Sequence, residues 1–258
     1  TEPLKEFGVK ITSKKKMLPV EIVGSYFLRP IKYIEKLGSA QCKSSVMLAA
    51  IKTPGITKIK ALKSRNHTEL FFKNLKIPIK IVSNGKYDFI DIKGQYNYSG
   101  FTYKVPGDIS SASFFLVLTL LSKNSKLLIK DVNINKSRLG IVKILNRMNA
   151  NIILKNKKIY KGEAISDILV NSKKNLKAIK CPEILNSTAI DEFLVIFLVA
   201  AKAKGISTFK NLGELNKKES PRLEIGISFL KKIGIKVVRK RNDIKIYGNP
   251  SLSLSGNY

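Results

Sequence analysis

The stretch GDISSASFFLVLTLL, residues 107–121, decides the fold. It begins as a polar turn, Gly107–Ser111, and continues as the almost entirely apolar segment Ala112–Leu121. A helix that is apolar on every side is a buried helix. Lys123–Asn124–Ser125 interrupt the segment, and the apolar run Leu127–Ile129 predicts a short strand after them. The plan is therefore a polar turn, a buried helix, a break and a strand.

The same plan occurs once before and once after this stretch. The two further copies are Gly38–Gln41 with the helix Cys42–Ile51 and the strand Ile56–Ile59, and Ile190–Glu192 with the helix Phe193–Ala203 and the strand Ile206–Phe209. Copies this long and this far apart are unlike the short units of a solenoid.

A second plan follows each copy, and it consists of another helix and a strand–turn–strand. The second helices are Thr68–Leu75, one with apolar Ile141, Ile144, Leu145 and Met148, and one that starts near Arg222. The predicted hairpins are Ile77–Val82 and Phe89–Ile92 around Asn84–Gly85, Asn151–Leu154 with a turn at Asn156–Lys157, and Ile235–Val238 and Ile244–Tyr247 around Asn242–Asp243. We therefore expect an α/β chain of three βαβαββ units.

The last of these helices has recognisable ends. Ser220 followed by Pro221 predicts an N-cap and a first helical residue. Leu223 and Leu230 follow at helical spacing, and Gly234 occupies the position where a helix commonly ends. Because free N–H groups and the helix dipole favour anions at a helix start, the preceding segment Asn216–Arg222, with its cations and one carboxylate, predicts an anion site.

Composition limits the remaining possibilities. The chain has 258 residues, is 44% hydrophobic and carries a formal net charge of +30. Such a charge fits a basic nucleic-acid-binding protein, but the lysines are spread along the whole sequence, so we favour no nucleic-acid partner. Cys42 and Cys181 have no metal-ligand spacing, and the single His67 excludes a multi-histidine metal site. The longest apolar run is too short to span a membrane, so we expect a cytoplasmic protein without a membrane partner.

Both ends of the chain look incomplete. It opens on Thr1 without an initiator Met, continues with an apparent helix end at Leu4–Gly8 and then a strand, and stops after Ser255–Tyr258 without a closing element. We expect a fragment of a longer protein that lacks both termini.

Five motifs, in this order, resemble the 5-enolpyruvylshikimate-3-phosphate (EPSP) synthase family, most closely its class II branch. They are Gly38–Ser44, Lys63–Glu69, Val105–Ala112, Ile190–Glu192 and Lys218–Arg222. The resemblance implies the two-domain enolpyruvyl transferase fold, built from βαβαββ units with the helices inside and the sheets outside. Residues 1–104 would be the later part of the first domain and residues 105–258 most of the second.

The resemblance also implies a reaction. The family transfers the enolpyruvyl group of phosphoenolpyruvate to the 5-hydroxyl of shikimate 3-phosphate and releases phosphate, in the shikimate pathway to aromatic amino acids. No metal and no organic cofactor is implied, and the full-length protein is expected to be a monomer. Such chemistry needs a base, an acid, and cations for two phosphates and a carboxylate.

By the same resemblance, individual residues receive roles. Asp191 is the expected base and shikimate contact, with helix N-cap as its alternative or additional role, and Glu219 is the expected proton shuttle. The shikimate 3-phosphate contacts are Ser39, Ala40, Gln41, Ser64, Arg65, Asp191 and Lys218, and the phosphoenolpyruvate contacts are Gln41 and Arg222. We interpret Asp108, Ser110 and Ser111 first as helix-capping residues.

The sequence departs from the family pattern at two positions, and two other functions remain as alternatives. Pro221 and Glu214 replace side chains that are more usual in the family, so no substrate role is carried over to Glu214. The alternatives are a UDP-N-acetylglucosamine enolpyruvyl transferase, whose hallmark cysteine we do not find, and a basic nucleic-acid-binding protein. The 258 residues alone are expected to turn over poorly.

Overall fold

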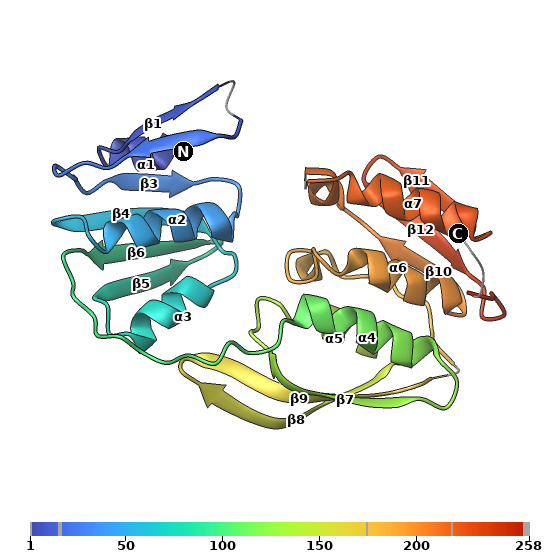
Figure 1. Ribbon diagram of the computed structural model, residues 1–258. Coiled ribbons are helices and arrows are strands. Elements are labelled where there is room, and N and C mark those ends of the chain that lie inside the picture. Colours follow the sequence, from blue (N-terminus) through green and yellow to red (C-terminus); the bar gives the residue numbers. More distant parts are fainter. Residues whose placement is uncertain (1, 15–16, 174, 218, 255–258) are drawn as a thin grey trace. The chain divides into compact units, whose positions relative to one another are not determined.

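The computed structural model describes residues 2–14, 17–173, 175–217 and 219–254 (Figure 1). The chain forms two compact units. Unit 1 comprises Thr1–Tyr103 and Lys161–Glu163, and unit 2 comprises Lys104–Tyr160 and Ala164–Tyr258. Whether residues 1–104 and 105–258 correspond to the family's two domains stays a prediction, and each unit is described by itself.

Unit 1 contains a hairpin and a four-stranded sheet. Its elements are α1 (Glu2–Glu6), β1 (Lys10–Ser13), β2 (Val20–Val23), β3 (Lys32–Glu35), α2 (Ala40–Ala50), β4 (Ile56–Leu62), α3 (His67–Asn74), β5 (Ile79–Asn84) and β6 (Tyr87–Lys93). The sheet has the order β3-β4-β6-β5, with β3 parallel to β4 and the other pairs antiparallel. Helices α2 and α3 pack on this sheet (Figure 1). Their side chains Val46, Met47 and Phe72 are buried in the core of the unit.

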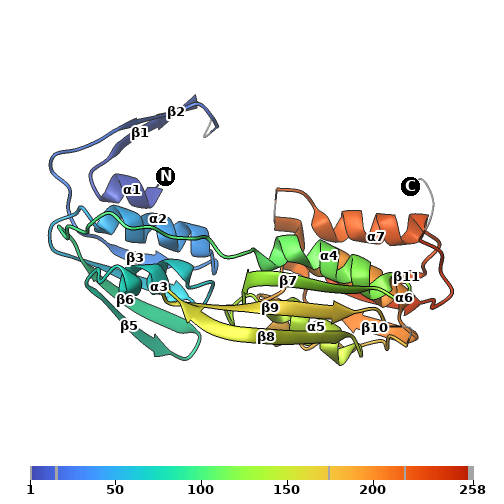
Figure 2. The ribbon, with the colours of Figure 1, turned by 60° about the horizontal axis from the view of Figure 1, so that its bottom comes forward.

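The described residues of unit 2 form two three-stranded sheets and four α-helices. The elements of this unit are α4 (Ile109–Leu121), β7 (Lys126–Asn133), α5 (Gly140–Arg147), β8 (Asn151–Tyr160), β9 (Glu163–Asn171), η2 (Glu183–Leu185), α6 (Phe193–Lys202), β10 (Gly205–Phe209), η3 (Gly213–Lys217), α7 (Arg222–Lys232), β11 (Val237–Lys240) and β12 (Asp243–Gly248). Figure 2 shows the strands β7, β9 and β8 side by side in one of these sheets.

The sheets confirm the βαβαββ repeat. The orders β7-β9-β8 and β10-β12-β11 correspond to β4-β6-β5 of unit 1. In unit 1 the leading strand β3 pairs in parallel with β4. In unit 2 the leading strands are reduced to parallel bridges. One repeat has a bridge from Gly107 to Val132, and the other has bridges from Lys177 to Lys204, just before β10, and from Lys180 to Thr208 on β10. Each repeat therefore uses the same strand order.

The core of unit 2 gathers around α6. The rings of Phe193, Phe197 and Phe209 are in mutual contact, with centroids 5.4–5.9 Å apart. Gly226 brings α7 close to α6, because a Cβ there would lie 2.9 Å from Leu194 Cδ2 and 3.1 Å from Phe197 Cδ2. Edge-to-face aromatic packing of this kind adds about 0.5–1.5 kcal/mol per pair to the burial of the rings.

Helix α4 differs from its prediction as a fully buried helix. Ile109, Leu116 and Leu120 are buried, but Phe114, Phe115 and Leu118 are more than half exposed. The reason is geometric, since α4 contacts β7 and α6, and these two elements cover only part of its circumference. No helix in the described parts of the chain is long and apolar enough to span a membrane.

The predicted turn at Asn156–Lys157 is wrong, because β8 continues through both residues. The hairpin turns instead at Lys161–Gly162, where φ is 46° and 88°, the two positive values of a type I′ turn. Asn156 does adopt the left-handed conformation expected of a turn residue, with φ 50°. Its amide donates to Asp167 on β9 at 2.7 Å, so the strand pair accommodates the irregularity and continues.

The start of α7 also differs from its prediction. The N-cap position is Pro221, not Ser220, and no side chain at that position caps the helix. The cap comes from Asn216, whose Oδ1 accepts the Leu223 N–H at 3.1 Å while its amide donates to Glu224. The predicted end is confirmed: Gly234 has φ +83°, and the bonds Gly234 N–H to Lys231 O and Ile235 N–H to Leu230 O form a Schellman motif.

Candidate functional site

In unit 1, the first predicted substrate segment begins α2. Ser39 is the N-cap, and its Oγ accepts the Cys42 N–H at 3.2 Å. Ala40 and Gln41 are the first two helical residues. The preceding turn is fixed by the buried carboxylate of Glu35, which accepts the N–H groups of Leu37 and Gly38 at 2.8 and 2.7 Å. The segment is thus a rigid helix start that can offer N–H groups to an anion.

The second predicted segment of unit 1, Ser64–Arg65, lies just before α3. The starts of α2 and α3 are joined by a hydrogen bond between the hydroxyls of Ser44 and Thr68 at 2.6 Å. The Ser64 Oγ is buried and has no hydrogen-bond partner among the described residues. Because buried hydroxyls are nearly always paired, this atom is a candidate ligand contact. The structure therefore brings the start of α2 together with the loop that carries the second segment.

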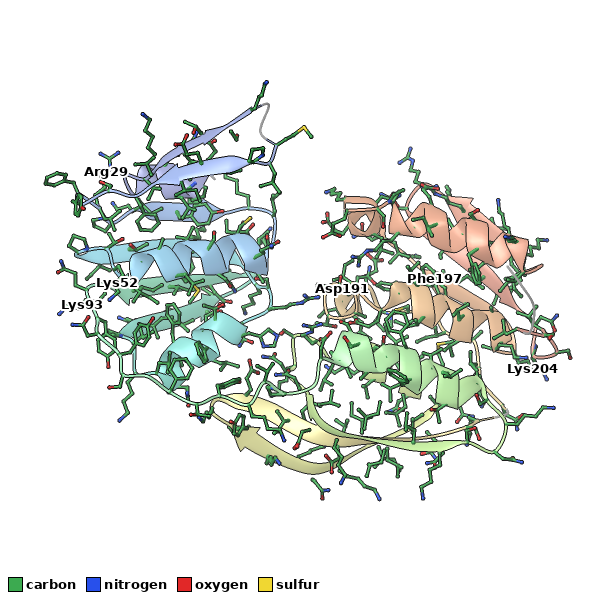
Figure 3. The ribbon with its side chains drawn as sticks, viewed as in Figure 1. Arg29, Lys52, Lys93, Asp191, Phe197 and Lys204 are labelled. Atoms are coloured by element: carbon green, nitrogen blue, oxygen red, sulfur yellow. The ribbon has the colours of Figure 1, made fainter. Side chains whose placement is uncertain are left out.

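In unit 2, Arg222 connects the two predicted catalytic carboxylates. Its Nη1 donates to Asp191 Oδ1 at 2.9 Å, and its Nη2 donates to Glu219 Oε2 at 3.2 Å. The side chain of Asp191 is 21% exposed and that of Glu219 is 86% exposed. Asp191 lies at the start of α6 (Figure 3), where Glu192 holds the N-cap position, so the role of Asp191 as N-cap is wrong. Lys218 lies outside the described residues.

A second network supports this cluster. Arg138, just before α5, donates from Nη2 to Asp108 Oδ1 at 2.8 Å and to Ser110 Oγ at 2.5 Å. The Ser110 hydroxyl donates in turn to the carboxylate of Glu192, which is 3% exposed. Asp108 also caps α4 by accepting the Ser111 N–H, as predicted. The starts of α4, α5 and α6 are therefore linked next to Asp191.

Sequence reasoning assigned no role to Arg138 or Glu192. A signal for Arg138 was present, because Lys136–Ser137–Arg138 repeats Lys63–Ser64–Arg65 one unit later in the chain. Its Nε is buried without a hydrogen-bond partner among the described residues. Glu192 stands in the Ile190–Glu192 motif, but its burial and its bond to Ser110 depend on the tertiary structure.

The approach to Asp191 is held by a close backbone contact. Gly140 begins α5, and its N–H donates to Thr188 O at 3.1 Å. A Cβ at Gly140 would lie 2.5 Å from the carbonyl carbon of Thr188 and 2.6 Å from Ala189 N. Only glycine therefore permits this contact, and the contact fixes the segment that leads into Asp191.

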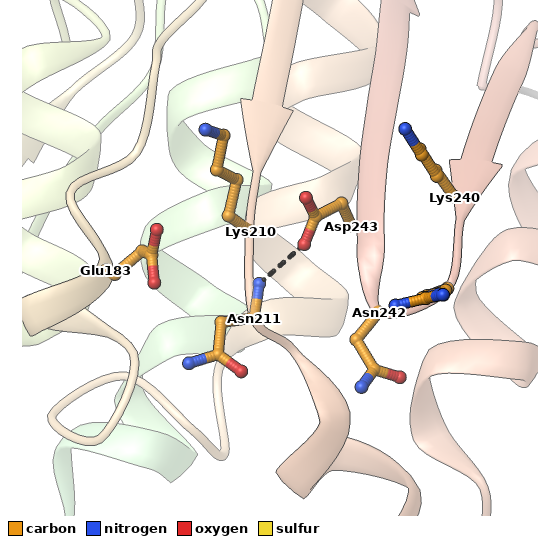
Figure 4. Close-up of a pocket in the computed structure, with 7 residues that line it drawn as sticks. Glu183, Lys210, Asn211, Lys240, Asn242 and Asp243 are labelled. Atoms are coloured by element: carbon orange, nitrogen blue, oxygen red, sulfur yellow. Dashed lines mark hydrogen bonds between the residues drawn. The ribbon is translucent and has the colours of Figure 1, made fainter.

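A separate hollow in unit 2 contains none of the predicted site residues. It has a volume of about 670 Å³ and is lined by Lys240–Asp243, Lys210–Asn211 and Glu183 (Figure 4). The Asn211 N–H donates to Asp243 Oδ1 across it at 2.9 Å. It is an open surface depression at strand ends and turns, so the linked helix starts are the better candidate site. The described parts of the chain hold no cluster of three His, Cys, Asp or Glu side chains that could bind a metal.

This fold is that of the enolpyruvyl transferases. The enolpyruvyl transferase NikO from Streptomyces tendae superposes with a TM-score of 0.64 at 15% identity, over 96% of this chain and 57% of that chain, a level of identity that shows the fold alone. The family model of EPSP synthase (3-phosphoshikimate 1-carboxyvinyltransferase) matches residues 1–256, and the chain belongs to that family.

Individual relatives agree with this assignment. A 3-phosphoshikimate 1-carboxyvinyltransferase of Petrotoga mobilis is 37% identical over 255 residues, which cover 97% of this chain and 58% of the relative. The structure of EPSP synthase from Acinetobacter baumannii superposes with a TM-score of 0.84 at 34% identity, over 96% of this chain and 55% of that chain. The chain therefore spans a little more than half the length of the relatives it matches.

Proposed function

We propose that this chain serves the transfer of the enolpyruvyl group from phosphoenolpyruvate to the 5-hydroxyl of shikimate 3-phosphate, with release of phosphate. The observation that carries the proposal is the Asp191–Arg222–Glu219 cluster in a chain of the EPSP synthase family. Two carboxylates on one guanidinium provide a base, a second proton carrier and a cation in one place. These are the groups that an addition–elimination at an enol phosphate requires.

Asp191 is the proposed base. Its shielded carboxylate, oriented by Arg222 at 2.9 Å, accepts the proton of the 5-hydroxyl as the oxygen attacks C2 of phosphoenolpyruvate. Glu219, which is largely exposed, gives a proton to the methylene carbon, and a tetrahedral intermediate forms. Glu219 then takes a proton back from the resulting methyl group as the C–O bond to phosphate breaks, which restores the double bond. The proton on Asp191 leaves with the phosphate or to solvent.

The other proposed contacts bind the substrates. Ser39, Ala40, Gln41, Ser64, Arg65, Asp191 and Lys218 are proposed for shikimate 3-phosphate, and Gln41 and Arg222 for phosphoenolpyruvate. A guanidinium has five N–H donors in a planar fork that suits a phosphate or carboxylate. Arg222 can therefore hold the substrate anion while it orients Asp191.

Calorimetric titration of the 258-residue chain with shikimate 3-phosphate tests the proposal. We expect saturable binding, weakened by Gln41→Ala and by Asp191→Ala, and no binding of UDP-N-acetylglucosamine. Phosphate release from phosphoenolpyruvate, with and without shikimate 3-phosphate, provides the catalytic measurement. Absence of shikimate 3-phosphate binding by a folded chain would refute the proposal.

The proposal includes a cytoplasmic location, a monomeric full-length protein and no nucleic-acid partner. In its support, basic side chains occur in both units and form no single stripe along the sequence. A salt titration of nucleic-acid affinity tests the last point, since a steep slope at tight affinity would indicate a nucleic-acid-binding protein instead.

A further inference from the structure

A fully buried ion pair lies directly behind the two predicted phosphate-binding segments of unit 1. Lys43 on α2 has no exposed side-chain surface, and Glu69 on α3 has 4%. The Lys43 Nζ lies 2.5 Å from Glu69 Oε1. The second carboxylate oxygen of Glu69 is buried and has no hydrogen-bond partner among the described residues.

The pair has a third member that is part of the backbone. The Lys43 Nζ also donates to the carbonyl oxygen of Arg65 at 3.0 Å. Lys43 lies two residues after Gln41, and Glu69 lies four residues after Arg65. A single ammonium group therefore connects the helix that begins with Ser39–Gln41 to the peptide of the Ser64–Arg65 loop.

A gain in folding stability does not explain why this ion pair is buried. Two charges lose their hydration on burial, and replacing a buried ion pair by well-packed apolar side chains is often neutral or stabilising. The Ser44–Thr68 bond already ties the same two helices together. What the ammonium adds is a directional bond to the Arg65 peptide, with its own charge neutralised by Glu69.

We propose that Lys43 and Glu69 are positioning residues that fix the Arg65 peptide, and through it Ser64 and Arg65, for the phosphate group of shikimate 3-phosphate. The proposal rests on the proposed function. Neither side chain reaches the ligand, since both are buried. Their effect is confined to the part of the substrate that the Ser64–Arg65 loop binds.

The test is a pair of binding titrations, with shikimate 3-phosphate and with shikimate, which lacks the phosphate. The variant Lys43→Met/Glu69→Met removes both charges together and fills the space with unbranched apolar side chains of similar size, so no lone charge is left buried. We expect affinity for shikimate 3-phosphate to fall roughly 10- to 100-fold, as for loss of one well-ordered charged contact. Affinity for shikimate should stay within about twofold of the unchanged chain, a difference of about 0.4 kcal/mol.

Ser44→Ala is the matched control, because it removes a bond between the same helices without touching Arg65. We expect it to leave the preference for the phosphorylated ligand unchanged. In an Arg65→Ala background, the double methionine change should weaken shikimate 3-phosphate binding by a smaller factor than in the unchanged chain, because the part of its effect that acts through the Arg65 side chain is already lost. If the double variant fails to fold, Glu69→Asp keeps both charges but draws the ammonium away from the Arg65 carbonyl, and the same selective loss is expected.

The outcomes are distinguishable. If the unchanged chain binds no shikimate 3-phosphate, the proposed function fails and the inference fails with it. If the unchanged chain binds and a folded double variant binds equally well, only the inference fails. An equal loss of affinity for both ligands would show a general structural role and would also overturn it.

Discussion

Replacing Gly140 by alanine tests whether the close contact at the start of α5 holds the segment that leads to Asp191. The new Cβ would lie 2.5–2.6 Å from backbone atoms of Thr188 and Ala189. Backbone on both sides cannot yield as a flexible side chain can, so the α5 start or the Thr188–Ala189 segment must move. The Gly140 N–H bond to Thr188 O, 3.1 Å long, would lengthen as well.

The expected magnitude follows from three terms. Overpacking of a tight site costs about 1–3 kcal/mol, and weakening one hydrogen bond costs about 1 kcal/mol. The better helix propensity of alanine recovers up to about 1 kcal/mol. The net expected destabilisation is about 1–3 kcal/mol. At about 3 °C per kcal/mol for a structure of this size, the melting temperature should fall by roughly 3–9 °C.

Calorimetry of the folded chain measures the stability, and titration with shikimate 3-phosphate measures the effect on the site. We expect weaker binding because the displaced segment leads into Asp191. Gly107→Ala is the matched control in the same unit, since its Cβ would meet nothing nearer than 3.6 Å. A Gly140→Ala chain as stable as the unchanged one, or a control that is equally destabilised, would refute the reasoning.

Three further predictions concern the charged and titratable groups. Arg222→Lys keeps the charge but loses the planar fork, so we expect phosphoenolpyruvate binding and turnover to fall about tenfold or more while stability changes little, as measured by titration and phosphate release. Burial raises the pKa of Cys181 to about 11, whereas Cys42 is exposed, so iodoacetamide at pH 8 should label one thiol in the folded chain and two in denaturant. The free energy of unfolding should fall between about pH 9 and pH 11, because in that range the Cys181 thiol ionises only in the unfolded chain. The hydrogen bond from Arg239 lowers the pKa of Glu224. The stabilisation by this carboxylate is therefore fully present above the usual glutamate pKa and is lost as the pH falls through the lowered pKa. In unfolding measured as a function of pH, Glu224→Gln should reduce the loss of stability at acid pH, and an unchanged pH profile would contradict this prediction.

The order of helices and strands could be read from the sequence because each unit repeats the same local signals. Gly234 ends α7 where the sequence predicted, because a glycine directly after an amphipathic helix commonly adopts the positive φ that terminates the helix. At Asn156 the positive φ expected of a turn residue is present, but the predicted turn is not, because strand β8 continues through this residue. A left-handed asparagine can either turn the chain or interrupt a strand, and the partner Asp167, eleven residues away in the sequence, decides which.

The parts of the candidate site that lie at helix starts could be expected from the sequence, and the parts that depend on burial could not. Asp191, Glu219 and Arg222 stand in recognisable motifs, and the structure joins them. Lys43 and Glu192 lie within two of the quoted motifs, but the sequence does not show that their charged side chains are buried. Periodicity cannot show this, because the polar partners that make their burial possible come from other repeats or other helices.

The chain passes between its two units at three places, after Tyr103, after Tyr160 and after Glu163. The last two crossings bracket Lys161–Gly162–Glu163, and there Glu163 Oε1 lies 2.5 Å from His67 Nδ1, in hydrogen-bond contact. Neither unit is therefore one uninterrupted length of polypeptide. A single protease cut at Tyr103 would place Lys161–Glu163, which belong to unit 1, on the other fragment, and a gene truncated at that point would yield a first half without Glu163, the hydrogen-bond partner of its His67.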